Sequence, residues 1–207
     1  MMLRVGLTGG IACGKSTVAA LMREFGCHVL EADKLAHQLM EPGQPAYLEI
    51  LRDFGEQILS ADQRINRAAL GEVVFRDSKR LKRLNEIVHP RVIQEQDRQL
   101  AAWERDGVPV AVVEAALLIE AGYHKHVDRL VVVWCRPEQQ RERLQARGLT
   151  SEQIAQRIAA QMPLEEKRRL ADDEIDCSGT LEATRRQVEE LVKKVKQLAS
   201  RESNSQR

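Results

Sequence analysis

A phosphate-binding loop near the start of the chain constrains the fold more than any other feature. The sequence Gly9-x-x-x-x-Gly14-Lys15-Ser16 matches the Walker A motif, and it lies between an apolar run, Leu3 to Thr8, and a segment with helical spacing. This strand, loop and helix order lets backbone N–H groups and the helix N-terminus surround phosphate oxygens. The motif predicts a nucleotide-binding protein; the remaining alternative is a Gly-rich turn that opens an ordinary helix.

The residue types in this loop fit the binding of a nucleoside triphosphate together with a metal ion. The glycines, among them Gly10 and Gly14, let backbone N–H groups turn toward phosphate oxygens. We expect Lys15 to reach the β and γ phosphates and the Ser16 hydroxyl to coordinate Mg²⁺. The loop therefore predicts ATP and Mg²⁺ but not a reaction, because GTPases, regulatory ATPases and small-molecule kinases all share it.

Composition and charge argue against several classes of protein. The 32 Lys and Arg residues nearly balance the 31 Asp and Glu residues, giving a formal net charge of +1 and no broad basic surface for nucleic acid. No stretch approaches the ~18 consecutive apolar residues of a membrane span. The four cysteines lie far apart without a C-x-x-C pair, as in a reducing compartment. We expect a cytoplasmic protein that binds neither nucleic acid nor a membrane and is a monomer or a small homo-oligomer.

Apolar runs alternate with segments of helical spacing, which is the pattern of an α/β protein with a parallel sheet. The expected strands are Leu3 to Thr8, His28 to Ala32, Val108 to Glu114, Leu130 to Cys135 and Glu174 to Cys177. Helices are expected at Lys15 to Phe25, Pro137 to Arg147 and Leu181 to Leu198. Together with the loop, this order predicts a three-layer P-loop NTPase fold with a five-stranded parallel sheet.

Residues 34–107 contain no convincing strand and are too long for a simple crossover. The expected helices in this region are Asp33 to Met40, Ala46 to Phe54, Arg67 to Phe75 and Ser78 to Trp103, the last kinked or broken at Pro90. We interpret residues 34–107 as a helical insertion that meets a substrate. Residues 148–163 are interpreted as a short lid, with a capping-box pair at Thr150 and Gln153. The nucleotide-binding core then comprises residues 1–33, 108–147 and 164–199, and residues 200–207 are expected to be a disordered tail.

Carboxylates at the ends of two predicted strands favour a kinase over a GTPase. The chain has no N-K-x-D sequence, and its one D-x-x-G, Asp176 to Gly179, follows the last strand. Asp33 lies at the expected end of the second strand, and parallel sheets bind ligands at the carboxyl ends of their strands. Its carboxylate could accept the proton of an attacking hydroxyl or position the metal, or it could cap the next helix. Glu114 ends the third strand and could hold Mg²⁺ through water, or it could be a polar strand end only.

Arginines after the fourth strand are candidates for stabilising a transferred phosphoryl group. Arg143 and Arg147 are four residues apart on one face of the predicted helix, where like charges repel each other. A shared anionic partner would explain this pair, because phosphoryl transfer places negative charge on equatorial oxygens. Arg141 is on the same helix, and Arg157 in the predicted lid is equally consistent with a solvated surface residue.

These motifs resemble the dephospho-coenzyme A kinase family from Leu3 to about Gly179. Beyond the loop, the matching stretches are Ala32-Asp33, Glu41 to Ala46, Phe54 to Leu59, Asn66 to Leu70, Phe75, Leu84-Asn85, His89-Pro90, Leu117 to Glu120, Pro137-Glu138, Arg143 with Arg147, Gln161 and Ala171 to Asp176. The family often has different residues at a few places: Asp at Glu31, Asp and Pro at Glu114 and Ala116, Asn at Cys177, and Gly-Ser at Ala12-Cys13.

The resemblance implies ATP-dependent phosphorylation of the ribose 3′-hydroxyl of dephospho-coenzyme A, which gives coenzyme A and ADP. Under this resemblance Asp33 is the catalytic base, and Lys15 and Arg143 stabilise the transferring phosphoryl group. The cofactor-binding residues are Gly10, Ala12, Cys13, Gly14, Lys15, Ser16, Thr17 and Arg147. The helical insertion becomes the coenzyme-binding domain, and His89 has a packing role in it.

Two other functions stay open. A kinase for another small hydroxyl substrate, such as a nucleoside monophosphate or shikimate, would share the loop and the fold. An ATP-dependent regulatory or binding module would bind nucleotide without transferring phosphate to an acceptor. An assay with several acceptors distinguishes these possibilities.

Overall fold

The chain folds into two compact units. The structure, a computed structural model, describes residues 2–205, apart from the side chains of Phe75 and of residues 202–205. The first unit comprises Met1–Glu31 and Ala101–Arg207, and the second comprises Ala32–Leu100. Compared with the expected domains, residues 32–33 belong to the second unit and residues 101–107 to the first. Residues 148–163, the expected lid, belong to the first unit.

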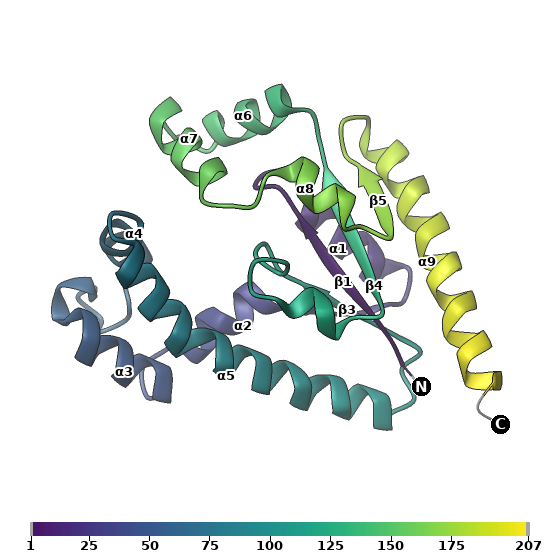
Figure 1. The fold of residues 1–207 in the computed structure, drawn as a ribbon, viewed down its shortest axis with the longest axis horizontal. Helices are drawn as coiled ribbons and strands as arrows, with labels where there is room; N and C mark the ends of the chain where they lie inside the picture. The colour runs from purple at the N-terminus through teal and green to yellow at the C-terminus, as the bar shows by residue number, and fades with distance from the viewer. Residues whose placement is uncertain (1, 206–207) are drawn as a thin grey trace. The chain divides into compact units, whose positions relative to one another are not determined.

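A five-stranded parallel sheet forms the centre of the first unit (Figure 1). Its strands are β1 (Leu3–Gly9), β2 (His28–Glu31), β3 (Val110–Glu114), β4 (Arg129–Trp134) and β5 (Asp173–Asp176), in the spatial order β2-β3-β1-β4-β5. The central strands are apolar on both faces, as expected for a parallel sheet covered on both sides. The expectation of a five-stranded parallel sheet is confirmed, and every strand end lies within two residues of its expected place.

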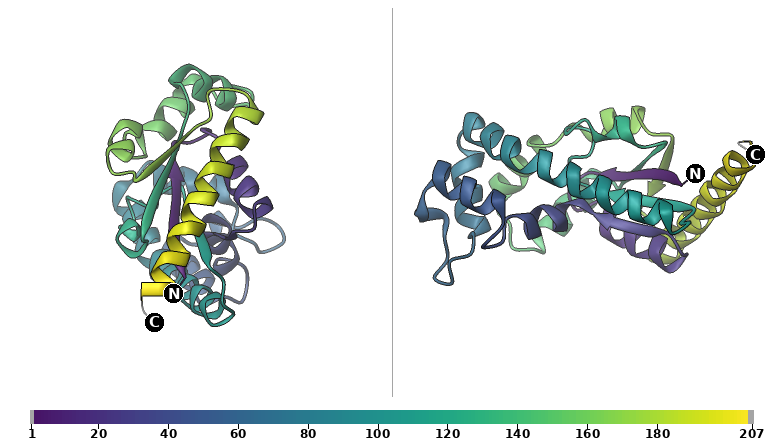
Figure 2. Two further views of the ribbon diagram at one scale, coloured as in Figure 1. Left: turned by 90° about the vertical axis from the view of Figure 1, so that its right-hand side faces the viewer. Right: turned by 90° about the horizontal axis from the view of Figure 1, so that it is seen from below.

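Helices cover one face of the sheet and a loop with a short helix covers the other. The helices and turns of this unit are α1 (Lys15–Glu24), η2 (Tyr123–His126), α6 (Pro137–Gln145), α7 (Ser151–Ala159), α8 (Leu164–Arg169) and α9 (Leu181–Ser205). On one face, α1 and α9 lie side by side (Figure 2), and Met22 and Val195 pack into one core with Leu7 and Val133 of the sheet. On the other face, α8 packs against β4, and Leu118 and Val127 pack against Gly6 of β1.

The second unit consists of helices, as the absence of strand patterns predicted. It contains α2 (Ala32–Leu39), α3 (Pro45–Phe54), η1 (Glu56–Ile58), α4 (Arg67–Phe75) and most of α5 (Ser78–Arg105). Asn66 caps α4, because its side-chain oxygen accepts hydrogen bonds from the N–H groups of Ala68 and Ala69 at 3.0 and 3.2 Å. The carboxylate of Glu49 on α3 accepts hydrogen bonds from Arg83 and Arg91 of α5 at 2.9 and 2.7 Å, which joins these two helices.

Pro90 does not break α5. The helix is continuous from Ser78 to Arg105, although proline cannot donate the hydrogen bond to the carbonyl of Glu86. Pro90 and Glu86 are both exposed, so water can bind the carbonyl that loses its donor. Of the two expected outcomes, a kink or a break, the break does not occur, because the cost of proline falls on the solvated side of the helix.

The last helix is longer than expected. We expected it to end at Leu198 and residues 200–207 to be disordered, but α9 runs to Ser205, and residues 206 and 207 lie outside the described part of the chain. Two contacts explain why the helix continues directly after Leu198. Ala199 is buried in the core, and the Ser200 hydroxyl donates a hydrogen bond to the Lys196 carbonyl at 2.9 Å. Within residues 2–205, no helix is both long and apolar enough to cross a membrane.

A close approach of two strands sets where the phosphate loop leaves the sheet. Gly9, the last residue of β1, is in register with Val133 of β4, and a Cβ atom at Gly9 would lie 2.2 Å from the Val133 carbonyl oxygen. Because this neighbour is backbone in the middle of a sheet, it cannot rotate away. Only glycine fits at this position.

We predict that Gly9→Ala lowers the free energy of unfolding by about 2–3 kcal/mol, because the new methyl group overpacks the β1–β4 contact. Urea denaturation followed by circular dichroism measures this change. Gly179→Ala is the matched control, since its Cβ would meet only the Ala183 side chain at 3.6 Å. Equal stability of the two variants would contradict the prediction.

Candidate active site

The phosphate loop lines a pocket of about 500 Å³ in the first unit. This volume is within the usual range for small-molecule sites. The loop side is formed by Gly10, Ile11, Ala12, Gly14, Lys15, Ser16 and Thr17, and the opposite side includes Arg143, Arg147, Cys177 and Gly179. The predicted cofactor-binding residues are thus brought together around one pocket, with the exception of Cys13, which is completely buried behind the loop.

Two residues of the loop have left-handed backbone conformations. Gly14, directly before α1, has a φ of 102°, and Ala12 has a φ of 60°. Glycine adopts such conformations freely, whereas an L-residue with a Cβ costs roughly 1–2 kcal/mol there. The loop therefore stores some backbone strain at Ala12, which surrounding contacts must offset.

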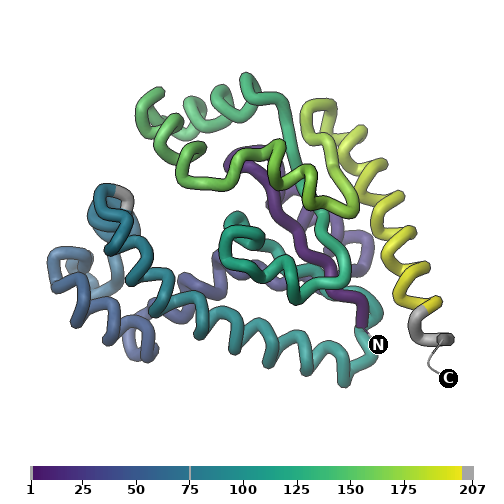
Figure 3. The backbone as a smooth tube through the Cα atoms, viewed as in Figure 1, coloured from purple at the N-terminus to yellow at the C-terminus, as the bar shows by residue number. Residues whose placement is uncertain are grey.

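Three side chains from distant parts of the sequence bind the backbone of the loop. The Gln161 side-chain oxygen accepts a hydrogen bond from the Ile11 N–H at 2.9 Å, and the Gln140 side-chain nitrogen donates to the Ile11 carbonyl at 2.7 Å. Arg143 donates to the carbonyls of Ala12 and Cys177 at 3.2 and 2.9 Å. In the backbone trace of Figure 3, the segment that follows α7 passes beside the loop. These bonds hold the loop in its strained shape.

Lys15 forms a largely buried ion pair with Glu114 at the end of β3. Its ammonium nitrogen lies 2.7 Å from Oε1 of Glu114, and the two side chains are only 13% and 4% exposed. The other carboxylate oxygen, Oε2, is buried and has no hydrogen-bond partner among the described residues. A buried carboxylate oxygen without a partner is costly unless a ligand or water binds it. Glu114 is therefore more than a polar strand end.

Asp33 and Glu31 lie at the carboxyl end of β2. Glu31 is the last residue of β2, in register with Glu114 of β3, and it forms an ion pair with Arg23 of α1. Asp33 is the second residue of α2 and belongs to the second unit. Its catalytic role stays a prediction.

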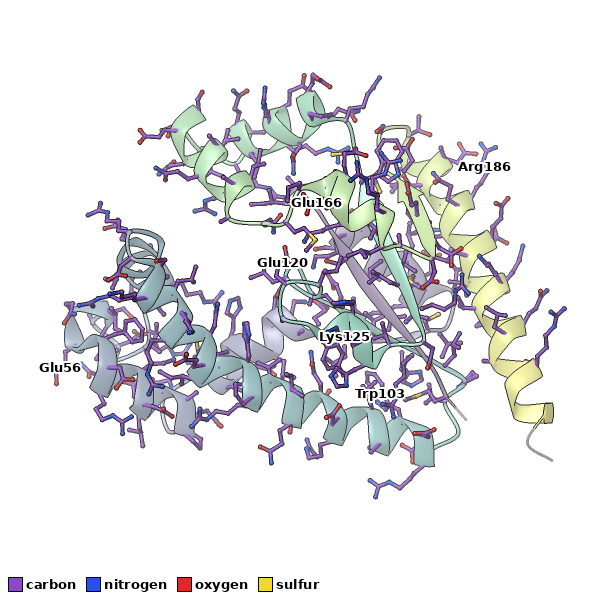
Figure 4. The ribbon with its side chains drawn as sticks, viewed as in Figure 1. Glu56, Trp103, Glu120, Lys125, Glu166 and Arg186 are labelled. Atoms are coloured by element: carbon purple, nitrogen blue, oxygen red, sulfur yellow. The ribbon has the colours of Figure 1, made fainter. Side chains whose placement is uncertain are left out.

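Sequence reasoning missed a buried lysine that bonds to Ala116, a residue of the pocket lining. Lys167 of α8 is completely buried, and its ammonium group donates to the Ala116 carbonyl at 2.9 Å and pairs with Glu120 at 2.8 Å. Glu120, labelled in Figure 4, also accepts a hydrogen bond from the Met162 N–H at 2.9 Å. Lys167 thus joins α8 to the segment after β3, and Glu120 joins that segment to the end of the predicted lid. A lysine among charged neighbours in Glu165-Glu-Lys-Arg-Arg169 gives no sequence signal of burial.

The other candidate residues lie away from the loop. Arg141 lines a separate pocket between α6 and α7, and Arg157 of α7 is exposed. Burial lowers the pKa of His89, so this half-buried imidazole is mostly neutral at pH 7, as fits its expected packing role. Among residues 2–205, no group of three or more His, Cys, Asp or Glu side chains is arranged to hold a metal ion.

Comparison with known proteins identifies the family. The model of the dephospho-CoA kinase family matches residues 3–183. The chain belongs to the dephospho-CoA kinase family. A dephospho-CoA kinase from Symbiobacterium thermophilum is 47% identical over 89% of this chain and 78% of its own length. One from Geobacter sulfurreducens is 47% identical over 90% of this chain and 95% of its own.

A solved structure supports the same fold. The dephospho-CoA kinase from Campylobacter jejuni superposes with a TM-score of 0.71 at 24% identity, covering 95% of this chain and 98% of its own. The P-loop kinase fold predicted from the Walker A motif and the strand order is therefore confirmed, and the protein is a kinase by family.

We predict that Lys167→Met lowers the free energy of unfolding by about 1–3 kcal/mol, because it removes the hydrogen bond to the Ala116 carbonyl and the ion pair with Glu120. Chemical denaturation measures the loss. Lys193→Met is the matched control and should change stability little, since the Lys193 side chain is 66% exposed.

A double-mutant cycle with Glu120→Gln separates the pair from other effects of the substitution. A coupling energy of about 0.5–1 kcal/mol or more is expected for two charged groups in direct contact of which one, Lys167, is buried. Additive effects of the two substitutions would show that Lys167 stabilises the fold without Glu120.

Proposed function

We propose that this kinase transfers the γ-phosphate of ATP to the ribose 3′-hydroxyl of dephospho-coenzyme A, giving coenzyme A and ADP. The observation that carries this proposal is the 47% identity to dephospho-CoA kinases over nine-tenths of the chain, together with a complete phosphate loop. In this reaction the acceptor oxygen bonds to the γ-phosphorus, the bond from that phosphorus to the bridging oxygen of ADP breaks, and one proton leaves the hydroxyl.

The ATP phosphates bind in the loop pocket. The backbone N–H groups of the loop and the N-terminus of α1 face the phosphate oxygens. Lys15, Arg143 and Arg147 supply positive charge around the same pocket. Because Lys15 and Arg143 are already held by Glu114 and by backbone carbonyls, their side chains lose little conformational freedom when ATP binds.

The oxygen atoms of two side chains near Lys15 are suited to hold Mg²⁺, directly or through water. The exposed Ser16 hydroxyl is the usual loop ligand, and the buried Oε2 of Glu114, which has no partner in the described chain, is suited to accept a hydrogen bond from a metal-bound water. When bound, the ion neutralises charge on the β and γ phosphates. In the absence of the ion, Glu114 still positions the ammonium group of Lys15.

Asp33 is the proposed base, and the second unit is the proposed binding surface for the coenzyme part of the acceptor. The carboxylate of Asp33 accepts the proton from the attacking hydroxyl, as its position at the end of the second strand suggests. Residues 148–163 act as the lid, and Gln161 connects this segment to the Ile11 N–H. Through this hydrogen bond, closure of the lid shifts the backbone of the phosphate loop.

Mass spectrometry of the products tests the proposed substrate. The protein is incubated with Mg-ATP and, separately, dephospho-coenzyme A, shikimate, AMP and CMP. We expect one added phosphate on dephospho-coenzyme A alone, and no transfer when EDTA removes the metal. Transfer to another acceptor would replace the substrate while keeping the kinase, and ATP binding without transfer to any acceptor would favour a regulatory module.

We predict that Asp33→Asn lowers kcat by about 100-fold or more, with ATP affinity nearly unchanged, because an amide cannot accept the proton of the hydroxyl. Steady-state kinetics and isothermal titration calorimetry measure the two quantities. Asp77→Asn is the matched control. Asp77 caps α5 through the Lys79 N–H at 2.8 Å, and asparagine caps a helix equally well. Normal turnover in Asp33→Asn would overturn the assignment of the base.

A further inference from the structure

One buried cysteine of the phosphate loop contacts a second cysteine that follows a strand of the sheet. Cys13 is part of the loop and Cys135 follows β4, and their sulfur atoms lie 3.4 Å apart. Both side chains are nearly completely buried, at 0% and 2% exposed. The two residues are 122 positions apart in sequence, so only the fold brings their thiols together.

The sulfur of Cys13 is packed against the backbone that binds phosphate. A Cβ atom at Gly10 would lie 2.9 Å from this sulfur, so the loop backbone rests directly on it. Cys135, in contrast, continues from a central strand, and the N–H of the next residue, Arg136, donates to the Ser178 hydroxyl at 3.1 Å. A bond between the two sulfurs would therefore move the loop rather than the sheet.

The two thiols differ in reactivity. The contact with the Cys13 thiol lowers the pKa of Cys135, and the nearby Arg143 charge acts in the same direction against the effect of burial. The same contact raises the pKa of Cys13 well above its usual range. Cys135 is therefore the member of the pair that more readily loses its proton to form the nucleophilic thiolate.

We propose that Cys13 and Cys135 form a redox-sensitive pair, in which a peroxide converts them to a disulfide that distorts the phosphate loop and reversibly stops ATP binding. A disulfide requires a sulfur separation near 2.05 Å, so the two atoms must approach by about 1.4 Å. Such a shift of the loop strains or breaks the hydrogen bonds that Ile11 and Ala12 make with Gln140, Gln161 and Arg143. Oxidation therefore changes the cradle that holds the phosphates.

The oxidation balances with hydrogen peroxide as the oxidant. The Cys135 thiolate attacks one peroxide oxygen, the O–O bond breaks, and the departing hydroxide takes up a proton to become water. Cys13 sulfur then attacks the sulfur of the resulting sulfenic acid, whose oxygen leaves with a proton as a second water. Two thiols lose two electrons in total and hydrogen peroxide gains them. A dithiol such as dithiothreitol reverses the process by thiol–disulfide exchange.

The other two cysteines provide internal controls. Burial raises the pKa of both Cys27 and Cys177, which keeps them as unreactive thiols. Cys27 lies between α1 and β2 and is not among the residues that line the loop pocket. Cys177 lines the pocket, so Cys27 is the better residue to substitute as a control.

The test treats the full-length protein with hydrogen peroxide and maps its peptides by mass spectrometry without reduction. We expect a peptide that links Cys13 to Cys135, a loss of about two mass units, and an affinity for ATP at least about tenfold weaker by calorimetry. Dithiothreitol should restore binding. Cys27→Ser should respond as the unsubstituted protein does, whereas Cys135→Ser and Cys135→Ala should bind ATP before and after peroxide.

Three results would overturn the proposal. The first is peroxide-treated protein without the linked peptide. The second is a linked protein that binds ATP as well as the reduced form does. The third is loss of ATP binding in Cys135→Ser or Cys135→Ala that matches the loss in the unsubstituted protein. The proposal rests on the proposed function only in taking the loop pocket as the ATP-binding site. The readouts need no acceptor, so a wrong acceptor substrate leaves this test intact.

Discussion

The shape of the phosphate loop depends on hydrogen bonds from side chains that are far away in the sequence. The N–H and carbonyl groups of Ile11 bind Gln161 and Gln140, and the Ala12 carbonyl binds Arg143. Without these bonds, the left-handed Ala12 would be free to relax, since an L-residue is strained in that conformation. The loop is therefore ready to bind phosphate only when α6 and the segment after α7 are in place. This makes Arg143 a structural residue as well as a proposed catalytic one.

Buried charge at the pocket is balanced in pairs. Lys15 pairs with Glu114, and Lys167 pairs with Glu120, each at a distance below 3 Å. Taking an isolated charge out of water costs several kcal/mol, so neither lysine could stay buried without its carboxylate. The first pair leaves one oxygen of Glu114 without a partner among the described residues, whereas the Lys167 ammonium group is bound to both Glu120 and the Ala116 carbonyl. Electrostatics thus separate a pair suited to ligand binding from a pair that stabilises the fold.

The thiol contact adds a different constraint to the same loop. Cys13 fills the space beneath Gly10 as a small buried side chain. The fold also places it against Cys135, and this contact makes its packing sensitive to oxidation. One side chain thereby supports the loop in the reduced protein and, under our proposal, disturbs it in the oxidised protein.

The sequence by itself determined the fold class, the parallel sheet and the position of the phosphate loop. These depend on patterns within short stretches: apolar strands, the Walker A spacing and the capping box of Thr150 with Gln153, which the structure contains. The motif also requires glycine at position 9. It does not reveal the physical cause, which is the close approach of the Val133 carbonyl. Local chemistry is enough for such features.

Only the tertiary structure decided which distant groups meet. The clamp on Ile11, the burial of Lys167 and the Cys13–Cys135 contact each join residues at least 50 positions apart. The continuity of α5 and the extension of α9 also depend on packing, because the cost of Pro90 depends on which side of the helix faces water, and Ala199 belongs to the core. Residue types report local preference, whereas burial and partners depend on the packed chain, and these set the charge, strain and reactivity of the site.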